Sequence, residues 1–271
     1  MSRETKNINS QTITFNHWIH NNQHNDSIDN LLNVHLITNN WIKFIPENST
    51  TIDIGAHIGD TLIPLIIAGT NNFQSKTKIL AIEPNEEISS ILKKNISDNL
   101  SNLVDIEHLP YAVIDEDDKK LIYSDFGCDN VNGGIIHDKM HEDLQNFLET
   151  RENQKMQSCK GFTLKYLCQK YLTLQELNKL SFIKIDTEGF DREIIHSSKD
   201  FLNEHKPVLY IEWYAFYSEQ DSVKLFKVIN DINYIPFNSE TLEKANVNIK
   251  INDLLLIHKE DINNINKTHI S

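Results

Sequence analysis

Short apolar runs alternate with helical patterns along most of the chain. The β-branched run 51–54 is followed by a helical pattern over 59–68, and the run 78–82 by one over 86–99. Apolar runs of strand length indicate buried strands, whereas apolar residues three and four positions apart indicate amphipathic helices. Their regular alternation predicts an α/β fold, in which a mostly parallel sheet carries helices on both faces.

This alternation continues to the end of the chain with one irregular interruption. The polar stretch 126–157 breaks it, with Asn132-Gly133-Gly134 as its main turn signal and a helix predicted over 141–150. The charged residues 115–120 should form a hairpin turn.

No long helix separates the last two strands, which predicts an antiparallel hairpin at one edge of the sheet. The other predicted strands are 104–109, 111–114, 121–124, 157–160, 181–185, 208–213, 234–237 and 253–258, and the other helices are 164–171, 191–201 and 222–231.

Polar composition sets the two ends of the chain apart from this core. Residues 1–49 are expected to form an N-terminal polar arm, loose to residue 27, and then a helical extension over 28–44. Residues 50–259 contain the alternating elements and form the main domain. Residues 260–271 are expected to be a disordered tail, as polar chain ends often are.

The charge balance and the absence of targeting signals narrow the function classes. The chain has 39 acidic and 26 basic residues, a formal net charge of −13, so no nucleic-acid partner is expected. The longest apolar run, 62–69, is far shorter than the ~20 residues of a membrane span, and the N-terminus lacks a secretory signal. Cys128, Cys159 and Cys168 show no metal-ligand spacing and are expected to be free thiols. We therefore expect a cytoplasmic protein.

The stretch from Thr50 to Thr61 combines a strand, a tight turn and the start of a helix. Asp53 ends the strand, and three residues separate Gly55 from Gly59. Glycine is required where the backbone has positive φ or passes close to a ligand, and a helix start offers free N–H groups. The spacing differs from the Gly-x-Gly-x-x-Gly of dinucleotide binders. It favours S-adenosylmethionine, a nucleoside that carries an amino acid.

Acidic residues follow several of the predicted strands. Glu83 ends the second strand, where a carboxylate can accept hydrogen bonds from both hydroxyls of a ribose. Asp53 could order the glycine turn, hold the ammonium group of the cofactor, or do both. Asp186 and Glu212 end two later strands, and carboxylates at adjacent strand ends can share a proton or bind a divalent cation.

Asp186 is the candidate for the reaction centre, where it could position the cofactor, orient a substrate hydroxyl or act as a general base. Glu188 and Asp191 should lie at a helix N-terminus, where negative charge is favoured, so at least one of them is structural. His137 and His141 lie in the irregular stretch, and either could act as a base because histidine titrates near neutral pH. Solvated loop histidines are the alternative, as a plain turn is for the nearby Gly133-Gly134.

Five motifs occur in a familiar order between about residues 50 and 258. They are Thr51–Thr61, Ala81–Asn85, Tyr111–Val113, Lys184–Asp191 and Pro207–Glu212. Together they resemble the FkbM family of S-adenosylmethionine-dependent methyltransferases, and the Lys-Ile-Asp-x-Glu-Gly motif is the most particular to that family. Gly133-Gly134 and Phe162-Thr163-Leu164 resemble two further family segments. The chain departs from the family at Lys165, where an aspartate is usual, and at His57, where asparagine is common.

The resemblance implies a Rossmann-like class I methyltransferase fold over residues 50–259. The implied sheet has seven strands in the order 3-2-1-4-5-7-6, with an antiparallel strand at its edge. The implied reaction is O-methylation of a hydroxyl on a sugar, a glycan or a small natural product. The implied cofactor is S-adenosylmethionine, and a divalent metal is the other cofactor considered.

The resemblance and the strand-end positions together assign the site. The expected cofactor-binding residues are Asp53, Gly55, Ala56, His57, Gly59, Thr61, Glu83, Pro84, Ala112 and Asp186. The candidate catalytic residues are Asp186, Glu212 and His137, and no residue is assigned as a metal ligand. Two other functions stay open: a non-catalytic module that binds S-adenosylmethionine or a protein partner, and a nucleotide-dependent oxidoreductase, which the missing glycine motif disfavours.

Overall fold

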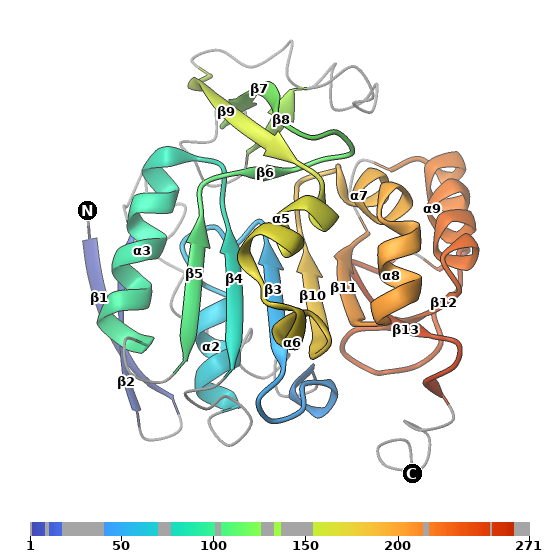
Figure 1. The fold of residues 1–271 in the computed structure, drawn as a ribbon, viewed down its shortest axis with the longest axis horizontal. Coiled ribbons are helices and arrows are strands. Elements are labelled where there is room, and N and C mark those ends of the chain that lie inside the picture. The colour runs from blue at the N-terminus through green and yellow to red at the C-terminus, as the bar shows by residue number, and fades with distance from the viewer. Residues whose placement is uncertain are drawn as a thin grey trace.

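A seven-stranded sheet forms the centre of the computed structural model (Figure 1). The structure describes residues 2–8, 11–17, 41–69, 77–100, 104–125, 133–136, 154–213, 217–249 and 251–262. A small second sheet lies above the carboxyl ends of the parallel strands, and a two-stranded hairpin lies at one side (Figure 1). None of the described helices is both long and apolar enough to cross a membrane.

Strand order in the central sheet follows β12-β13-β11-β10-β3-β4-β5. Its strands are β3 (Thr50–Ile54), β4 (Lys78–Ile82), β5 (Asp105–Leu109), β10 (Leu180–Ile185), β11 (Val208–Glu212), β12 (Tyr234–Asn238) and β13 (Asp253–His258). Counted from β3 and read from β5, this is the order 3-2-1-4-5-7-6 that the resemblance implies. The antiparallel strand is β13, which pairs with both β11 and β12. The antiparallel hairpin predicted for the last two strands is therefore confirmed at this edge, with β12 outermost and β13 as the seventh strand of the implied order.

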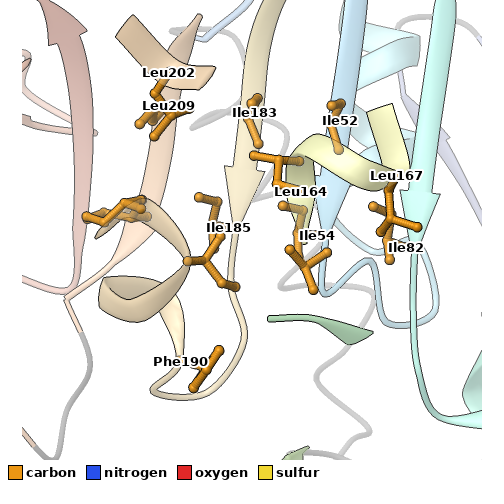
Figure 2. Close-up of a cluster of buried hydrophobic side chains, with 14 of the residues drawn as sticks. Ile52, Ile54, Ile82, Leu164, Leu167, Ile183, Ile185, Phe190, Leu202 and Leu209 are labelled. Carbon is orange, nitrogen blue, oxygen red and sulfur yellow. The ribbon is translucent and has the colours of Figure 1, made fainter. Parts of the chain in front are cut away.

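Alternate residues of each strand enter two apolar layers on opposite faces of the sheet. One layer is covered by α5 (Leu164–Tyr171), α6 (Leu174–Leu177), α7 (Asp191–Ser197), α8 (Lys199–His205) and α9 (Glu219–Asp231). The other is covered by η1 (Ile42–Phe44), α2 (Leu62–Ala68) and α3 (Glu86–Leu100). Figure 2 shows the first layer, where Leu164 and Leu167 lie beside Ile54 and Ile82. Burial of both faces explains why these strands are continuous apolar runs.

Local capping fixes several helix boundaries. The Thr163 hydroxyl accepts a hydrogen bond from Tyr166 N at the start of α5, and Thr173 forms a capping box at the start of α6. The single helix predicted over 191–201 is two helices, because the backbone turns at Ser198 between α7 and α8. A left-handed residue, Lys206, then ends α8.

Strand pairing in the small sheet differs from the prediction. Its strands are β6 (Ala112–Val113), β7 (Lys119–Ser124), β8 (Gly134–Ile136) and β9 (Met156–Phe162), in the order β6-β9-β7-β8. The hairpin expected around 115–120 is wrong, because β9 lies between β6 and β7 and pairs with both. Gly161 permits this, since a Cβ atom there would collide with Ile114 and Leu121. The helix predicted over 141–150 lies outside the described residues.

An antiparallel hairpin occupies part of the segment expected to be a loose arm. Strands β1 (Ser2–Ile8) and β2 (Gln11–His17) pair in continuous register, so the expectation is wrong for these residues. The Asn99 amide of α3 both donates to Thr14 O and accepts from Thr14 N at 2.8 Å, and Ile13 is buried. An isolated two-stranded hairpin is only marginally stable in water, so these contacts with α3 stabilise this one. The structure describes residues 41–44 of the helical extension predicted over 28–44. It describes residues 260–262 of the tail predicted over 260–271.

Candidate active site

The turn after β3 is held between the ends of two neighbouring strands. Gly55 N and Ala56 N both donate to Ile82 O of β4 at 3.0 Å, and Asp186 N donates to Ile54 O at 3.1 Å. Gly55 has φ +74°, and a Cβ atom there would overlap the carbonyl of Asp186. The glycine is thus required both by conformation and by the close approach of the chain after β10.

The second half of the turn is fixed from α3. The buried Asn95 amide donates to Ile58 O at 2.8 Å, and His57 has φ +47°. Gly59 has φ +88°, which keeps it outside the helix, so α2 begins at Leu62 rather than at the predicted residue 59. Thr61 precedes α2 without a side-chain cap. The backbone, more than these side chains, therefore shapes the predicted cofactor turn.

Glu83 connects this turn to the loop after β4. Its Oε2 accepts a hydrogen bond from His57 N at 3.0 Å, and its Oε1 accepts one from Asn85 N at 2.8 Å. The side chain is only 5% exposed, and burial raises its pKa despite the opposing influence of His57 and these N–H groups. Each carboxylate oxygen can accept further hydrogen bonds. Glu83 is therefore fixed in place with acceptor capacity that suits a ligand rich in hydroxyl groups.

Two other predicted cofactor residues have different surroundings. Pro84 is half-buried beside Glu83, in the turn that leads into α3. Ala112 is 3% exposed and packs in the apolar core as part of β6. The structure thus keeps Pro84 next to the site, whereas the Ala112 methyl group is covered by protein.

A buried lysine, to which the sequence analysis assigned no role, lies beneath the turn. Lys184 Nζ lies 3.3 Å from Asp53 Oδ1 and 3.2 Å from Asp186 Oδ2, and it donates to Gly55 O at 3.0 Å. Burial raises the pKa of Asp53, with Lys184 opposing it. Burial disfavours charge on Lys184, yet Asp186 and Asp53 raise its pKa overall. The available signal was a lysine within the apolar strand Phe182–Ile185.

Carboxyl groups crowd together where β10, β11 and β13 meet. Glu212 lies directly opposite Asp253 in the β11–β13 register, and Asp186 follows the adjacent β10. Burial, followed by the charges of Asp186 and its neighbours, raises the pKa of Glu212 well above its ordinary value. Burial likewise raises the pKa of Asp253 to about 6, although a hydrogen bond from Tyr210 opposes it. These side chains can hold protons at a pH where exposed carboxyls are ionised.

The loop after β10 adds two more such groups. Asp191 Oδ2 accepts hydrogen bonds from Thr187 Oγ1 at 2.6 Å and from Thr187 N at 3.1 Å. Burial and the charge of Asp186 raise the pKa of Asp191 to about 7. The same causes raise the pKa of Glu188 to about 8. As expected, Asp191 lies in the first turn of α7, where it braces the loop and serves a structural role.

Carboxyl groups that lie this close together can share protons. Within the ranges that the structure describes, no three His, Cys, Asp or Glu side chains are arranged to hold a metal ion. Cys159 and Cys168 are buried free thiols. Cys128, Asn132, His137 and His141 lie outside the described residues, so the roles predicted for them are not assessed by the structure.

Comparison with known proteins gives one match to a family model. The model described as the methyltransferase FkbM domain matches residues 53–236. A comparison with curated proteins gives no match.

Several solved structures are similar to this chain at low sequence identity. An FkbM methyltransferase from Methylobacillus flagellatus KT is 16% identical, with a TM-score of 0.45 over 78% of this chain and 44% of that one. An S-adenosylmethionine-dependent O-methyltransferase from Thermotoga maritima is 11% identical, with a TM-score of 0.40 over 90% and 67%. Magnesium protoporphyrin IX methyltransferase from Synechocystis PCC 6803, solved with bound S-adenosylmethionine, is 9% identical, with a TM-score of 0.46 over 89% and 86%. The chain spans less than half the length of the first of these proteins.

Proposed function

The chain belongs to the FkbM family of methyltransferases, and we propose that it transfers a methyl group from S-adenosylmethionine to a hydroxyl of a sugar, a glycan or a small natural product. The observation that carries the proposal is the position of Glu83. This buried carboxylate is fixed by two backbone N–H groups at the turn after β3, and it keeps acceptor capacity for ribose hydroxyls. This acceptor therefore fits the ribose of the nucleoside part of S-adenosylmethionine.

The acidic cluster supplies the second half of the proposed reaction. S-adenosylmethionine supplies an electrophilic methyl group on a sulfonium centre. The protein must align the acceptor oxygen with that methyl group and remove the hydroxyl proton, because a sugar hydroxyl is a very weak acid. Asp186 is the proposed base: its side chain is 38% exposed at the edge of the sheet, and Lys184 holds it there.

Glu212 has a different proposed part in the same step. Its raised pKa means that it carries a proton near neutral pH, so it can donate a hydrogen bond but cannot accept the proton of the substrate. It would orient the acceptor beside Asp186. His137 is retained as a third candidate for the base on its sequence position alone.

The proposal is tested with the purified full chain and labelled S-adenosylmethionine. Calorimetry should detect binding of S-adenosylmethionine, and a thermal-shift comparison should show no stabilisation by NADH. Incubation with a fractionated lysate of the source cells should then place the label in glycan or small-molecule fractions. Binding without any methylated fraction would favour the non-catalytic module instead, and stabilisation by NADH alone would favour an oxidoreductase.

Substitution of Asp186 separates catalysis from binding. Asp186→Asn should slow label transfer about a hundredfold or more, since that is the usual contribution of a general base, and it should weaken the Kd for S-adenosylmethionine by a much smaller factor. Asp231→Asn, at the exposed end of α9, is the matched control and should behave as the wild type. Full turnover by Asp186→Asn would exclude Asp186 as the base.

A further inference from the structure

The small sheet contacts the segment after β4 that begins with Glu83. Gln157 Oε1 of β9 accepts a hydrogen bond from Glu86 N at 3.3 Å, in the first turn of α3. Tyr123 of β7 lies directly opposite Gln157 in the β7–β9 register, and its side chain is hydrogen-bonded to that of Asn85. Two adjacent positions of the small sheet thus contact the loop between β4 and α3 and the first residue of α3. Figure 1 shows this sheet above the carboxyl ends of the central strands.

Tyr123 is placed there by close packing. Its side chain is 6% exposed, and a Cβ atom on Gly133 would collide with its hydroxyl and ring. The glycine before β8 is therefore explained by the approach of Tyr123, an explanation that the sequence did not offer. The phenol lies close enough to Glu83 and Glu188 for both charges to act on it.

The hydrogen bonds of Asn85 define what Tyr123 can do. Asn85 Oδ1 accepts from Glu87 N at 3.0 Å and from Ile88 N at 3.2 Å. Its hydrogen bond with Tyr123 acts to lower the pKa of the phenol, as a donor to Tyr123 Oη does, so the Asn85 amide nitrogen is the donor. The tyrosine oxygen then accepts from Asn85, and its own proton can be donated elsewhere. Burial, reinforced by Glu83, raises the pKa of Tyr123 far above its ordinary value, so the phenol is a hydrogen-bond donor at neutral pH and never a base.

Tyr123 and Glu83 are chemically complementary partners for a ribose. A ribose hydroxyl donates its proton to a carboxylate, and its oxygen still needs a donor. Glu83 can only accept while it is ionised, whereas Tyr123, which is hydrogen-bonded to Asn85 two residues further along, supplies an O–H group. We propose that Tyr123 is a cofactor-binding residue whose hydroxyl donates to the nucleoside end of the ligand held by Glu83, which makes the small sheet part of the cofactor site. This inference rests on the proposed use of S-adenosylmethionine.

The test compares the whole cofactor with its nucleoside fragment. Calorimetry gives the Kd of S-adenosylmethionine and of 5′-methylthioadenosine, which lacks the amino acid, for the wild type and for Tyr123→Phe. We expect Tyr123→Phe to weaken both ligands by the same factor, about tenfold, because one hydrogen bond is lost at the shared nucleoside end. Tyr166→Phe, on the half-buried α5 tyrosine that stacks on Phe162, is the matched control and should change neither Kd.

The outcomes separate this inference from the proposed function. If the wild type binds neither ligand, the proposed function and the role of Tyr123 both fail. If the wild type binds both ligands and Tyr123→Phe leaves both Kd values unchanged, only the role of Tyr123 is overturned. Weakening of S-adenosylmethionine alone would also overturn it, because the contact would then lie at the methionine end. Circular dichroism and the Tm of Tyr123→Phe verify that the fold is retained.

Discussion

The two halves of the carboxyl edge treat their acidic side chains in different ways. At β3 and β4 each carboxylate has a defined partner: Glu83 accepts from two backbone N–H groups, and Asp53 lies beside Lys184. After β10, Asp186 and Asp191 also have partners in Lys184 and Thr187, but the carboxyls lie near one another as well. Burial and the charge of Asp186 raise the pKa of Asp191 to about 7 and that of Glu188 to about 8. Under the proposed function, the first half binds the cofactor, whereas the second holds and exchanges protons.

Lys184 is the one described side chain whose ion pairs join the two halves. Its ammonium lies within 3.3 Å of Asp53 Oδ1 in the first half and within 3.2 Å of Asp186 Oδ2 in the second. Because it also donates to Gly55 O, the same group fixes the turn that both halves share. The comparison therefore predicts that disturbance of Lys184 affects both halves, whereas other changes affect one.

The largest expected effect is that of Lys184→Met. The substitution keeps the length and apolar stem of the side chain but leaves buried Asp53 without its cation, and breaking a buried pair in this way costs about 3–5 kcal/mol of unfolding free energy. Urea unfolding followed by circular dichroism measures this loss. Lys94→Met is the control, because the exposed pair of Lys94 with Asp98 on α3 should contribute almost nothing. A similar small loss for both variants would show that Lys184 does not join the two halves.

The next prediction concerns the pH dependence of stability in the proton-holding half. The unfolded Asp191 carboxyl loses its proton near its ordinary pKa of 3.8, whereas the folded one keeps it to about 7. The stability gained from this proton is complete below pH 3.8 and is lost as the pH rises through about 7. The unfolding free energy of the cofactor-free wild type should therefore fall between about pH 5 and about pH 8.

Asp191→Asn should reduce that fall. Asparagine keeps an acceptor for Thr187 but cannot ionise. The difference between the unfolding free energies at the two pH values should therefore shrink by about 2 kcal/mol. A residual slope should remain, because burial also raises the pKa of Glu188 and of Asp253. Denaturant unfolding at both pH values provides the measurement. An unchanged slope would contradict the assignment of a retained proton to Asp191.

The smallest expected effect is that of His57→Asn in the binding half. The backbone N–H of residue 57, not its side chain, donates to Glu83, so the Kd for S-adenosylmethionine should stay close to that of the wild type. Asparagine tolerates the left-handed conformation at φ +47° well, so stability should change by about 0.5 kcal/mol or less. Calorimetry and thermal unfolding test both statements. A large loss of affinity would mean that the imidazole, which lies 3.7 Å from Asp60, takes part in binding.

Local pattern in the sequence was enough to predict the central sheet and where its acids lie. Strands β4 and β13 and helix α5 match their predicted ranges, because their apolar periods and caps are encoded within the segments themselves. The placement of Glu83 and Asp186 follows from the same logic, since parallel strands bring their carboxyl ends to one edge. In each case the information lies within a few residues of the feature.

Only the tertiary structure decided which distant groups meet. The contact between Lys184 and Gly55 joins residues 129 positions apart, the strand β9 enters between β6 and β7, and Asn99 docks the hairpin at Thr14 across 85 positions. Tyr123 reaches the loop of Asn85 in the same manner. Periodicity specifies which face of an element is buried but not which partner covers it. The sequence alone thus determined the fold class and the acidic strand ends, whereas long-range packing decided the counter-ion, the small sheet and its tyrosine.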